Sequence, residues 1–96
     1  MIKPVYRIYP AEDIYSTFPE DLKMGYVVVH WPNGKYKYFH NGKYHRIDGP
    51  AITYANGRQT WWVYGHSFKN TKEYQVAAEL SDEEMLVIIL KYGRVE

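Results

Sequence analysis

The sequence predicts an α+β fold in which an antiparallel β-hairpin repeat meander carries two C-terminal helices packed on one face. Three Asn-Gly pairs separate short runs rich in aromatic residues, and Asn-Gly is typical of a two-residue hairpin turn because both turn positions need positive φ. The stretches 31–43 and 54–66 repeat one pattern at a spacing of 23 residues, which indicates a copied supersecondary unit. Apart from one helical turn near the N-terminus, the signals for helices come after residue 70.

The length and composition predict one small domain that folds without a covalent staple. The chain has 96 residues and no cysteine, so disulfides and thiolate metal sites are excluded. We expect a single domain over 1–96, with an N-terminal strand and helical turn (1–25), a repeat sheet (26–70) and C-terminal helices (71–96). No apolar run reaches the ~18 residues of a membrane span and no signal-peptide stretch is present, so we expect a cytoplasmic protein with no membrane partner.

The first two thirds of the chain are predicted to form strands joined by short turns. Val5–Tyr9 alternates in polarity and is expected to be a strand that ends at Pro10. Ala11–Phe18 is expected to form a helical turn that stops before Pro19. Whether the N-terminal strand covers the outer face of the sheet stays open. Further strands are expected at 26–31, 35–40, 43–46, 51–54 and 59–64.

Two-residue loops would set the pairing of the strands and thereby the faces of the sheet. Trp31 would lie opposite Tyr36, and Ile52 opposite Trp61. The face that needs a cover would hold Val27, Val29, Trp31, Tyr36, Tyr38, Ile52, Tyr54, Trp61 and Val63. The face that meets water would hold Val28, His30, Lys35, Lys37, Phe39, Tyr44, Arg46, Thr53, Arg58, Thr60 and Trp62.

The C-terminal region is predicted to supply the cover as two helices. Thr71 is expected to cap a helix that runs to about Leu80. Ser81 and Glu84 form the pattern of a capping box that opens a second helix, and Gly93 is expected to end it.

The second predicted helix is apolar at every position from Met85 to Leu90, which is more than one buried face can use. Its second side would be covered either by the N-terminal segment or by another protomer. In the second case the chain would form a homodimer through this helix, and the expected oligomerisation residues are Met85, Ile88 and Ile89.

Charge is unevenly distributed although the formal net charge is only +1. Between Lys23 and Lys69 there are seven Lys or Arg residues and one acid, Asp48, whereas the other acids lie toward the two ends. A basic middle can attract an anionic partner, or it can be neutralised within the fold by acidic ends that pack near the sheet.

Candidate catalytic and metal-binding residues are better explained as structural. His45, Arg46 and Asp48 together supply an imidazole and a carboxylate, but Asp48 before Gly49-Pro50 is typical of a turn-capping side chain. The predicted register places His30 across from Lys37 and His40 across from Lys43, so the histidines do not converge on a metal. We therefore expect no enzymatic activity, no catalytic residue, no metal and no cofactor.

The water-facing side of the sheet is the candidate partner-binding surface. Basic side chains beside aromatic rings suit a protein interface, and they also suit single-stranded nucleic acid, with cations on phosphates and rings under bases. The third reading is a solvated face on which Lys and Arg stems merely cover rings. The expected partner-binding residues are Lys35, Lys37, Phe39, Tyr44, Arg46, Arg58 and Trp62.

The segment Asn41–Ala51 reads NGKYHRIDGPA, and it resembles the NGKxHRxDGPA element of a small MORN-like, antitoxin-like repeat family of phages, giant viruses and bacteria. The resemblance extends over 25–69 and contains one full copy of the motif. In the next copy, 65–69 departs from the pattern, as expected of a terminal repeat that leads into a helical cap. The resemblance implies a sheet of repeated hairpins and a phage origin, and it implies no general activity.

These observations predict a non-enzymatic accessory factor that binds a protein. Given the distribution of the family, we expect a phage-encoded protein that acts in the host cytoplasm and modulates or inhibits a host protein, such as a defence protein. The alternative is a nucleic-acid-binding protein that uses the basic and aromatic face of the sheet.

Overall fold

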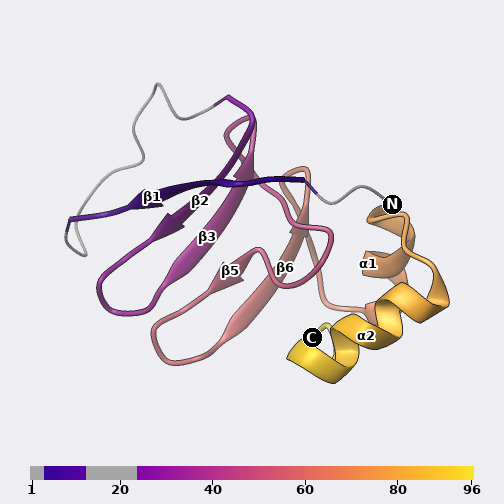
Figure 1. Cartoon of the computed structure of the whole chain (residues 1–96). Helices are drawn as coiled ribbons and strands as arrows, with labels where there is room; N and C mark the ends of the chain where they lie inside the picture. The colour runs from indigo at the N-terminus through magenta and orange to yellow at the C-terminus, as the bar shows by residue number, and fades with distance from the viewer. Residues whose placement is uncertain (1–3, 13–23) are drawn as a thin grey trace.

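A computed structural model describes residues 4–12 and 24–96 of the chain. Within them, seven strands form a mixed sheet in the order β1-β2-β3-β5-β6-β7, with β4 paired to β3 (Figure 1). The strands are β1 (Arg7–Pro10), β2 (Tyr26–His30), β3 (Tyr36–His40), β4 (Lys43–Tyr44), β5 (Ile52–Thr53), β6 (Gln59–Val63) and β7 (His66–Phe68), followed by the helices α1 (Thr71–Ala77) and α2 (Asp82–Tyr92). The predicted α+β fold with two C-terminal helices is confirmed, while the helical turn predicted over 11–18 falls largely outside the described residues.

The N-terminal strand extends the sheet at its edge. β1 pairs with β2 in parallel, whereas the other five strand pairs of the described residues are antiparallel. Ala11, just after β1, donates its N–H to the carbonyl of His30 at 2.7 Å. Ala11 and Tyr9 join the apolar cluster of β2 and β3, and the strand lies beside β2 within the sheet rather than across one of its faces.

The 23-residue repeat of the sequence is also a repeat of the structure, because the two copies have the same backbone conformation. The Trp31 N–H donates to the Lys35 carbonyl at 2.9 Å, and in the next copy the Tyr54 N–H donates to the Arg58 carbonyl at 2.8 Å. Each of these hairpin loops ends in a glycine with positive φ, 91° at Gly34 and 89° at Gly57. The tight turns that follow also match, with φ of 50° and 80° at 41–42 and of 48° and 83° at 64–65.

The predicted register is wrong by one residue in both long hairpins. Val29 lies opposite Lys37 rather than Tyr38, and Ile52 lies opposite Thr60 rather than Trp61. The reason is that residues 32–34 and 55–57 form loops of three residues, each ending in a positive-φ glycine, where the prediction assumed loops of two. A slip of one residue moves every side chain of a strand to the other face relative to its neighbour. By contrast, the register predicted for His40 and Lys43 is confirmed.

The corrected register gives the protein two apolar clusters on opposite faces of the sheet. One cluster lies on the face of β2 and β3, and its buried members are Ala11, Val27, Val29, Trp31 and Phe39. The other lies under the helices, and its buried members are Trp61, Val63, Tyr74, Ala78, Met85, Ile88 and Val95. The helices therefore cover the face that holds Trp61 and Val63. The prediction had placed Val27, Val29 and Trp31 on that same face, but they lie on the opposite one.

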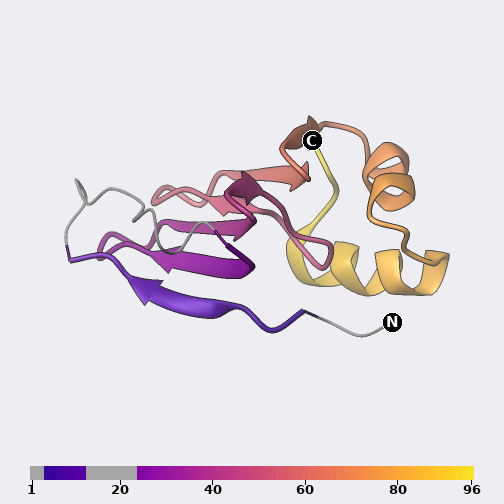
Figure 2. The same cartoon turned by 90° about the horizontal axis from the view of Figure 1, so that it is seen from above.

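The helices begin at well-formed caps and lie together at the end of the sheet away from the 32–34 and 55–57 loops (Figure 2). The N-cap of α1 is Asn70, whose side chain accepts the Glu73 N–H at 3.0 Å, and not Thr71 as predicted. The predicted capping box of α2 is confirmed, because Ser81 and Glu84 each accept the backbone N–H of the other. Gly93, at φ 93°, follows the last turn of α2.

Candidate functional site

The structure brings six of the seven predicted partner-binding residues onto one face of the sheet. By the observed register these are Lys35, Lys37, Phe39, Tyr44, Arg58 and Trp62, here called the basic–aromatic face. The Nζ atom of Lys35 lies 4.5 Å from the centre of the Trp31 ring. The Nζ atom of Lys37 lies 5.7 Å from the same centre, and it donates to the Tyr44 hydroxyl at 3.3 Å. Tyr44 and Trp62 pack edge to face, with ring centres 5.1 Å apart.

The rings of this face differ in their accessibility. Trp31 is 9% exposed and Phe39 is 7% exposed, so both belong to the apolar cluster of β2 and β3. Tyr44 and Trp62 are partly exposed. Both lysines lie over the buried Trp31 ring, and Lys37 also lies 5.4 Å from the centre of the partly exposed Tyr44 ring. Only part of the aromatic surface that the sequence suggested therefore meets solvent.

Arg46 does not belong to the basic–aromatic face. Its Nε donates to the Asp48 carboxylate at 2.8 Å, and its guanidinium carbon lies 4.0 Å from the centre of the Tyr38 ring. The same guanidinium donates to the Tyr92 hydroxyl at 3.0 Å, which ties this loop to the end of α2. The strict alternation that placed Arg46 on the outer face fails because β4 ends at Tyr44 and the chain bends through 45–50.

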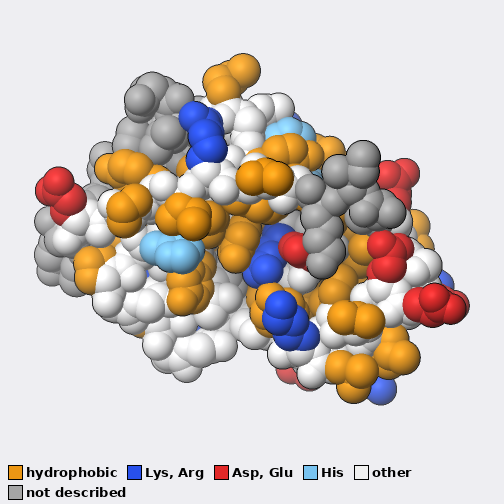
Figure 3. Space-filling view, in the orientation of Figure 1, with side chains coloured by type: hydrophobic (Ala, Val, Ile, Leu, Met, Phe, Trp, Pro, Cys, Tyr) orange, Lys and Arg blue, Asp and Glu red, His pale blue; other side chains and the backbone are white. Residues whose placement is uncertain are grey.

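The charges that remain on the sheet are all positive. Between residues 24 and 70 the one acid, Asp48, forms an ion pair with Arg46, and the other charged residues are Lys35, Lys37, Lys43, Arg58 and Lys69. The segment 71–96 has six acids and three bases. Because the helices lie at one end of the sheet, acidic side chains gather at that end of the molecule in the view of Figure 3. Within 4–12 and 24–96, the ion pair of Arg46 with Asp48 is the only one between described residues.

A second basic feature lies beside the start of β6. Three cationic residues, Arg58, Lys69 and Arg94, line a shallow hollow of about 450 Å³ together with the acid Glu96. Arg58 belongs to both this hollow and the basic–aromatic face, whereas Gln59 and Trp61, which also line the hollow, lie on the opposite face of the sheet. Sequence reasoning missed the hollow because its members are far apart along the chain.

His45 has a structural environment. It is 2% exposed, and its Nδ1 accepts the Tyr64 N–H at 3.0 Å, within a ring cluster that includes His40 at 5.3 Å. Burial, and to a smaller extent the neighbouring His40, lowers the pKa of His45 to about 4. The position equivalent to His45 in the next copy of the repeat is the core residue Phe68, as expected of a packing position.

Asp48 does not form a hydrogen bond with His45 of the kind that acid–base chemistry would use. Its carboxylate accepts from Arg46, where the sequence had predicted bonds from backbone N–H groups. His30 lies opposite Tyr36 instead of Lys37, as the corrected register requires. In the described part of the chain no three His, Asp or Glu side chains converge as a set of metal ligands.

The predicted oligomerisation residues lie inside the chain's own core. Met85 is 2% exposed and Ile88 is 6% exposed, and Ile89 packs against the same cluster. The apolar residues of α2 that face outward are instead Leu86, Val87 and Leu90, which are 56%, 63% and 79% exposed. A run that is apolar at every position indicates a second apolar side, but it does not say which residues point to which side.

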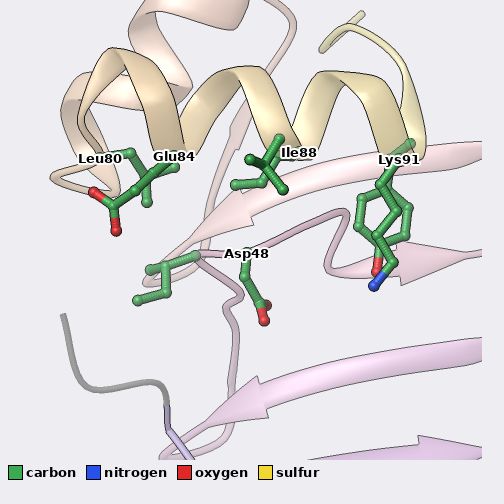
Figure 4. Close-up of a pocket in the computed structure, with 8 residues that line it drawn as sticks. Asp48, Leu80, Glu84, Ile88 and Lys91 are labelled. Atoms are coloured by element: carbon green, nitrogen blue, oxygen red, sulfur yellow. The ribbon is translucent and has the colours of Figure 1, made fainter.

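A groove of about 270 Å³ lies between α2 and the loop that follows β4 (Figure 4). Its apolar lining comes from Ile47, Leu80, Val87 and Ile88. The charged residues Asp48, Glu84 and Lys91 also line it. No single motif in the sequence marks this groove, because loop and helix are joined only by tertiary packing.

Comparison of the chain with protein-family models, with curated proteins and with solved structures found no match. Neither helix of the described residues is both long enough and apolar enough to cross a membrane.

Proposed function

We propose that the protein is a non-enzymatic binding protein whose basic–aromatic face docks an acidic surface of a partner protein. The observation that carries this proposal is the charge of the sheet, on which every charged residue from 24 to 70 outside the Arg46–Asp48 pair is basic. Such a surface attracts and orients an acidic partner. The resemblance of 41–51 to repeats of phages and giant viruses supports a phage-encoded factor that modulates a host protein.

The partly exposed rings support a protein partner. Tyr44 and Trp62 lie on the same face as Lys37 and Arg58, and Trp, Tyr and Arg are the residues that dominate protein interfaces. The hollow of Arg58, Lys69 and Arg94 offers three cations to an acidic side chain of the partner at the edge of this surface.

Nucleic acid is the weaker candidate on this geometry. Binding of single strands depends on rings whose faces are free to stack on bases. Trp31 and Phe39 are buried, and the Lys35 ammonium lies over the Trp31 ring. The cations would still attract phosphates, so the affinity-capture experiment described next is carried out with and without nuclease.

The test is affinity capture of the tagged chain from a bacterial lysate, with and without nuclease, followed by mass spectrometry. Lys35 and Arg58 hold equivalent positions in the two copies of the repeat, so the test variant is Lys35→Glu with Arg58→Glu. The control, Lys43→Glu with Lys72→Glu, makes the same change of charge at two exposed lysines away from the basic–aromatic face.

We expect one protein to survive nuclease and to be retained about tenfold less by the test variant, with unchanged retention by the control. Its retention should also fall as salt rises, because the attraction is screened. Loss of the captured material on nuclease treatment would move the nucleic-acid reading to first place. Equal retention by both double variants would exclude the basic–aromatic face as the docking surface.

A further inference from the structure

We propose that a second copy of this chain docks on the outward side of α2, with the two α2 helices packed antiparallel. The residues that would form the contact are Leu86, Val87 and Leu90, here called the α2 ridge. This inference does not rest on the function proposed for the sheet, because the ridge and the basic–aromatic face are different surfaces.

The α2 ridge is an apolar stripe that residues 4–12 and 24–96 leave uncovered. Leu86, Val87 and Leu90 are 56%, 63% and 79% exposed, although Met85 and Ile88 of the same helix are buried. Leu90 is four residues after Leu86 and three after Val87, so its side chain is the neighbour of both along one side of the helix. Single exposed apolar residues are ordinary, whereas a contiguous group beside an apolar groove is typical of an interaction site.

The groove beside α2 extends this apolar surface beyond the helix. Val87 belongs to both, since it forms part of the ridge and also lines the groove with Ile47 and Leu80. A partner that packs on the ridge would therefore also shield the open side of the groove.

The charges of α2 favour a second copy, packed antiparallel, over other occupants. The first turn has three acids, Asp82, Glu83 and Glu84, and the last turn has Lys91. When two copies pack antiparallel, the acidic end of each lies beside Lys91 of the other, and the two helix dipoles are aligned favourably. Parallel packing would place like charges together, and a partner helix of one charge would be repelled at one end of α2.

The arrangement also satisfies the symmetry of a closed dimer. In a twofold contact the same patch is used by both copies, so the patch must be complementary to itself. The α2 ridge meets this condition, because an apolar centre lies between an acidic end and a basic end.

The size of the patch predicts a weak dimer. α2 has 11 residues and is therefore about 16 Å long. One face of such a helix covers less than the roughly 800 Å² per partner of a standard interface. We therefore expect association to depend on concentration, between about 10 µM and about 1 mM.

The first experiment is sedimentation velocity of the full chain over that range, with Leu90→Glu as the test variant. Because Leu90 is 79% exposed, the substitution should leave the fold intact, which circular dichroism checks. The control is Val76→Glu, a similar change at a residue of α1 that is 66% exposed. We expect the wild type and the control to shift toward a dimer while Leu90→Glu stays a monomer. A wild type that remains a monomer throughout, or a Leu90→Glu variant that still dimerises, would overturn the proposal.

The second experiment tests the antiparallel orientation by exchange of charge. Glu83 is the better choice because Asp82 already accepts a hydrogen bond from Gln75. Glu83→Lys alone, or Lys91→Glu alone, should weaken the dimer about tenfold, whereas the double variant should restore it. Restoration supports antiparallel helices, and a double variant weaker than both single variants would rule this orientation out.

Discussion

At the scale of single residues, the neighbours His45 and Arg46 of the repeat motif are stabilised inside the protein in different ways. His45 is neutral, with its Nδ1 satisfied by the Tyr64 N–H. Arg46 stays charged and is held by Asp48, by the Tyr38 ring and by the Tyr92 hydroxyl. A buried polar side chain is tolerated only when it has such partners. The motif that looked catalytic in the sequence thus packs β4 against the turn after β6 and against α2.

His45 should make the stability of the protein depend on pH. Its folded pKa of about 4 lies below the value of about 6.5 in an unfolded chain, so the unfolded state binds more protons between these values. The contribution of His45 is complete above about pH 6.5 and is lost as the pH falls toward 4. We expect the free energy of unfolding to fall by about 1 to 2 kcal/mol between pH 7 and pH 5.

Urea denaturation at both pH values measures this change, and His45→Gln is the control. Glutamine can accept the Tyr64 N–H but does not titrate, so the other groups of the chain set its pH dependence. The variant should lose less stability than the wild type over the interval. Equal losses in the two proteins would show that His45 is not the titrating group.

At the scale of elements, the hairpin loops decide which residues share a face. The loops 32–34 and 55–57 contain three residues, and each ends in a glycine at positive φ. A side chain with a β-branch is strained at such a φ. At Gly57 an added Cβ would meet no atom within 4 Å, so a substitution there would report on backbone strain alone.

We expect Gly57→Val to lower the free energy of unfolding by more than ~1 kcal/mol, because valine disfavours positive φ. Gly57→Asn should cost less than half as much, since asparagine adopts this region more readily. The equivalent Gly34→Val should match Gly57→Val, given the φ of 91° at Gly34. Chemical denaturation of the three variants measures the differences. A Gly57→Val protein as stable as the wild type would mean that the loop has another conformation available.

At the scale of the whole molecule, the sheet separates two apolar clusters but also connects them. β6 contributes Trp61 to the cluster under the helices, while its neighbour Trp62 faces the other side with Tyr44. β5 joins β3 to β6, and Ile52 on it is 2% exposed. The two clusters have no strand in common, but β5 pairs with β3 of one and with β6 of the other, and Tyr44 beside the first cluster packs on Trp62 of β6. Loss of either cluster would therefore remove a partner of β5 and expose its backbone hydrogen bonds.

The protein should therefore unfold in one cooperative transition. Replacing Trp61 and Trp62 by Phe leaves Trp31 to report on the β2–β3 cluster, and replacing Trp31 and Trp62 leaves Trp61 to report on the cluster under the helices. In each variant, tryptophan fluorescence and far-ultraviolet circular dichroism should give the same midpoint in urea. Separate midpoints within either variant would show that the two clusters unfold independently.

Local features of the fold could be predicted from the sequence because they depend on neighbouring residues. The turn at 41–42, the capping box of Ser81 and Glu84 and the repeat spacing all follow from backbone preferences within a few positions. Six of the seven predicted partner-binding residues also share one face, although the predicted faces themselves were wrong for the residues of β2 and β5.

The register, the position of Arg46 and the outward side of α2 required the tertiary structure. Asn-Gly is compatible with loops of two or three residues, and packing across the sheet selects between them. An apolar run such as 85–90 can turn any of its sides inward, so only the contacts with Trp61 and Tyr74 place Met85 and Ile88 in the core and leave Leu86, Val87 and Leu90 outside. Short-range preferences are encoded residue by residue, whereas faces and surfaces arise from contacts between distant segments.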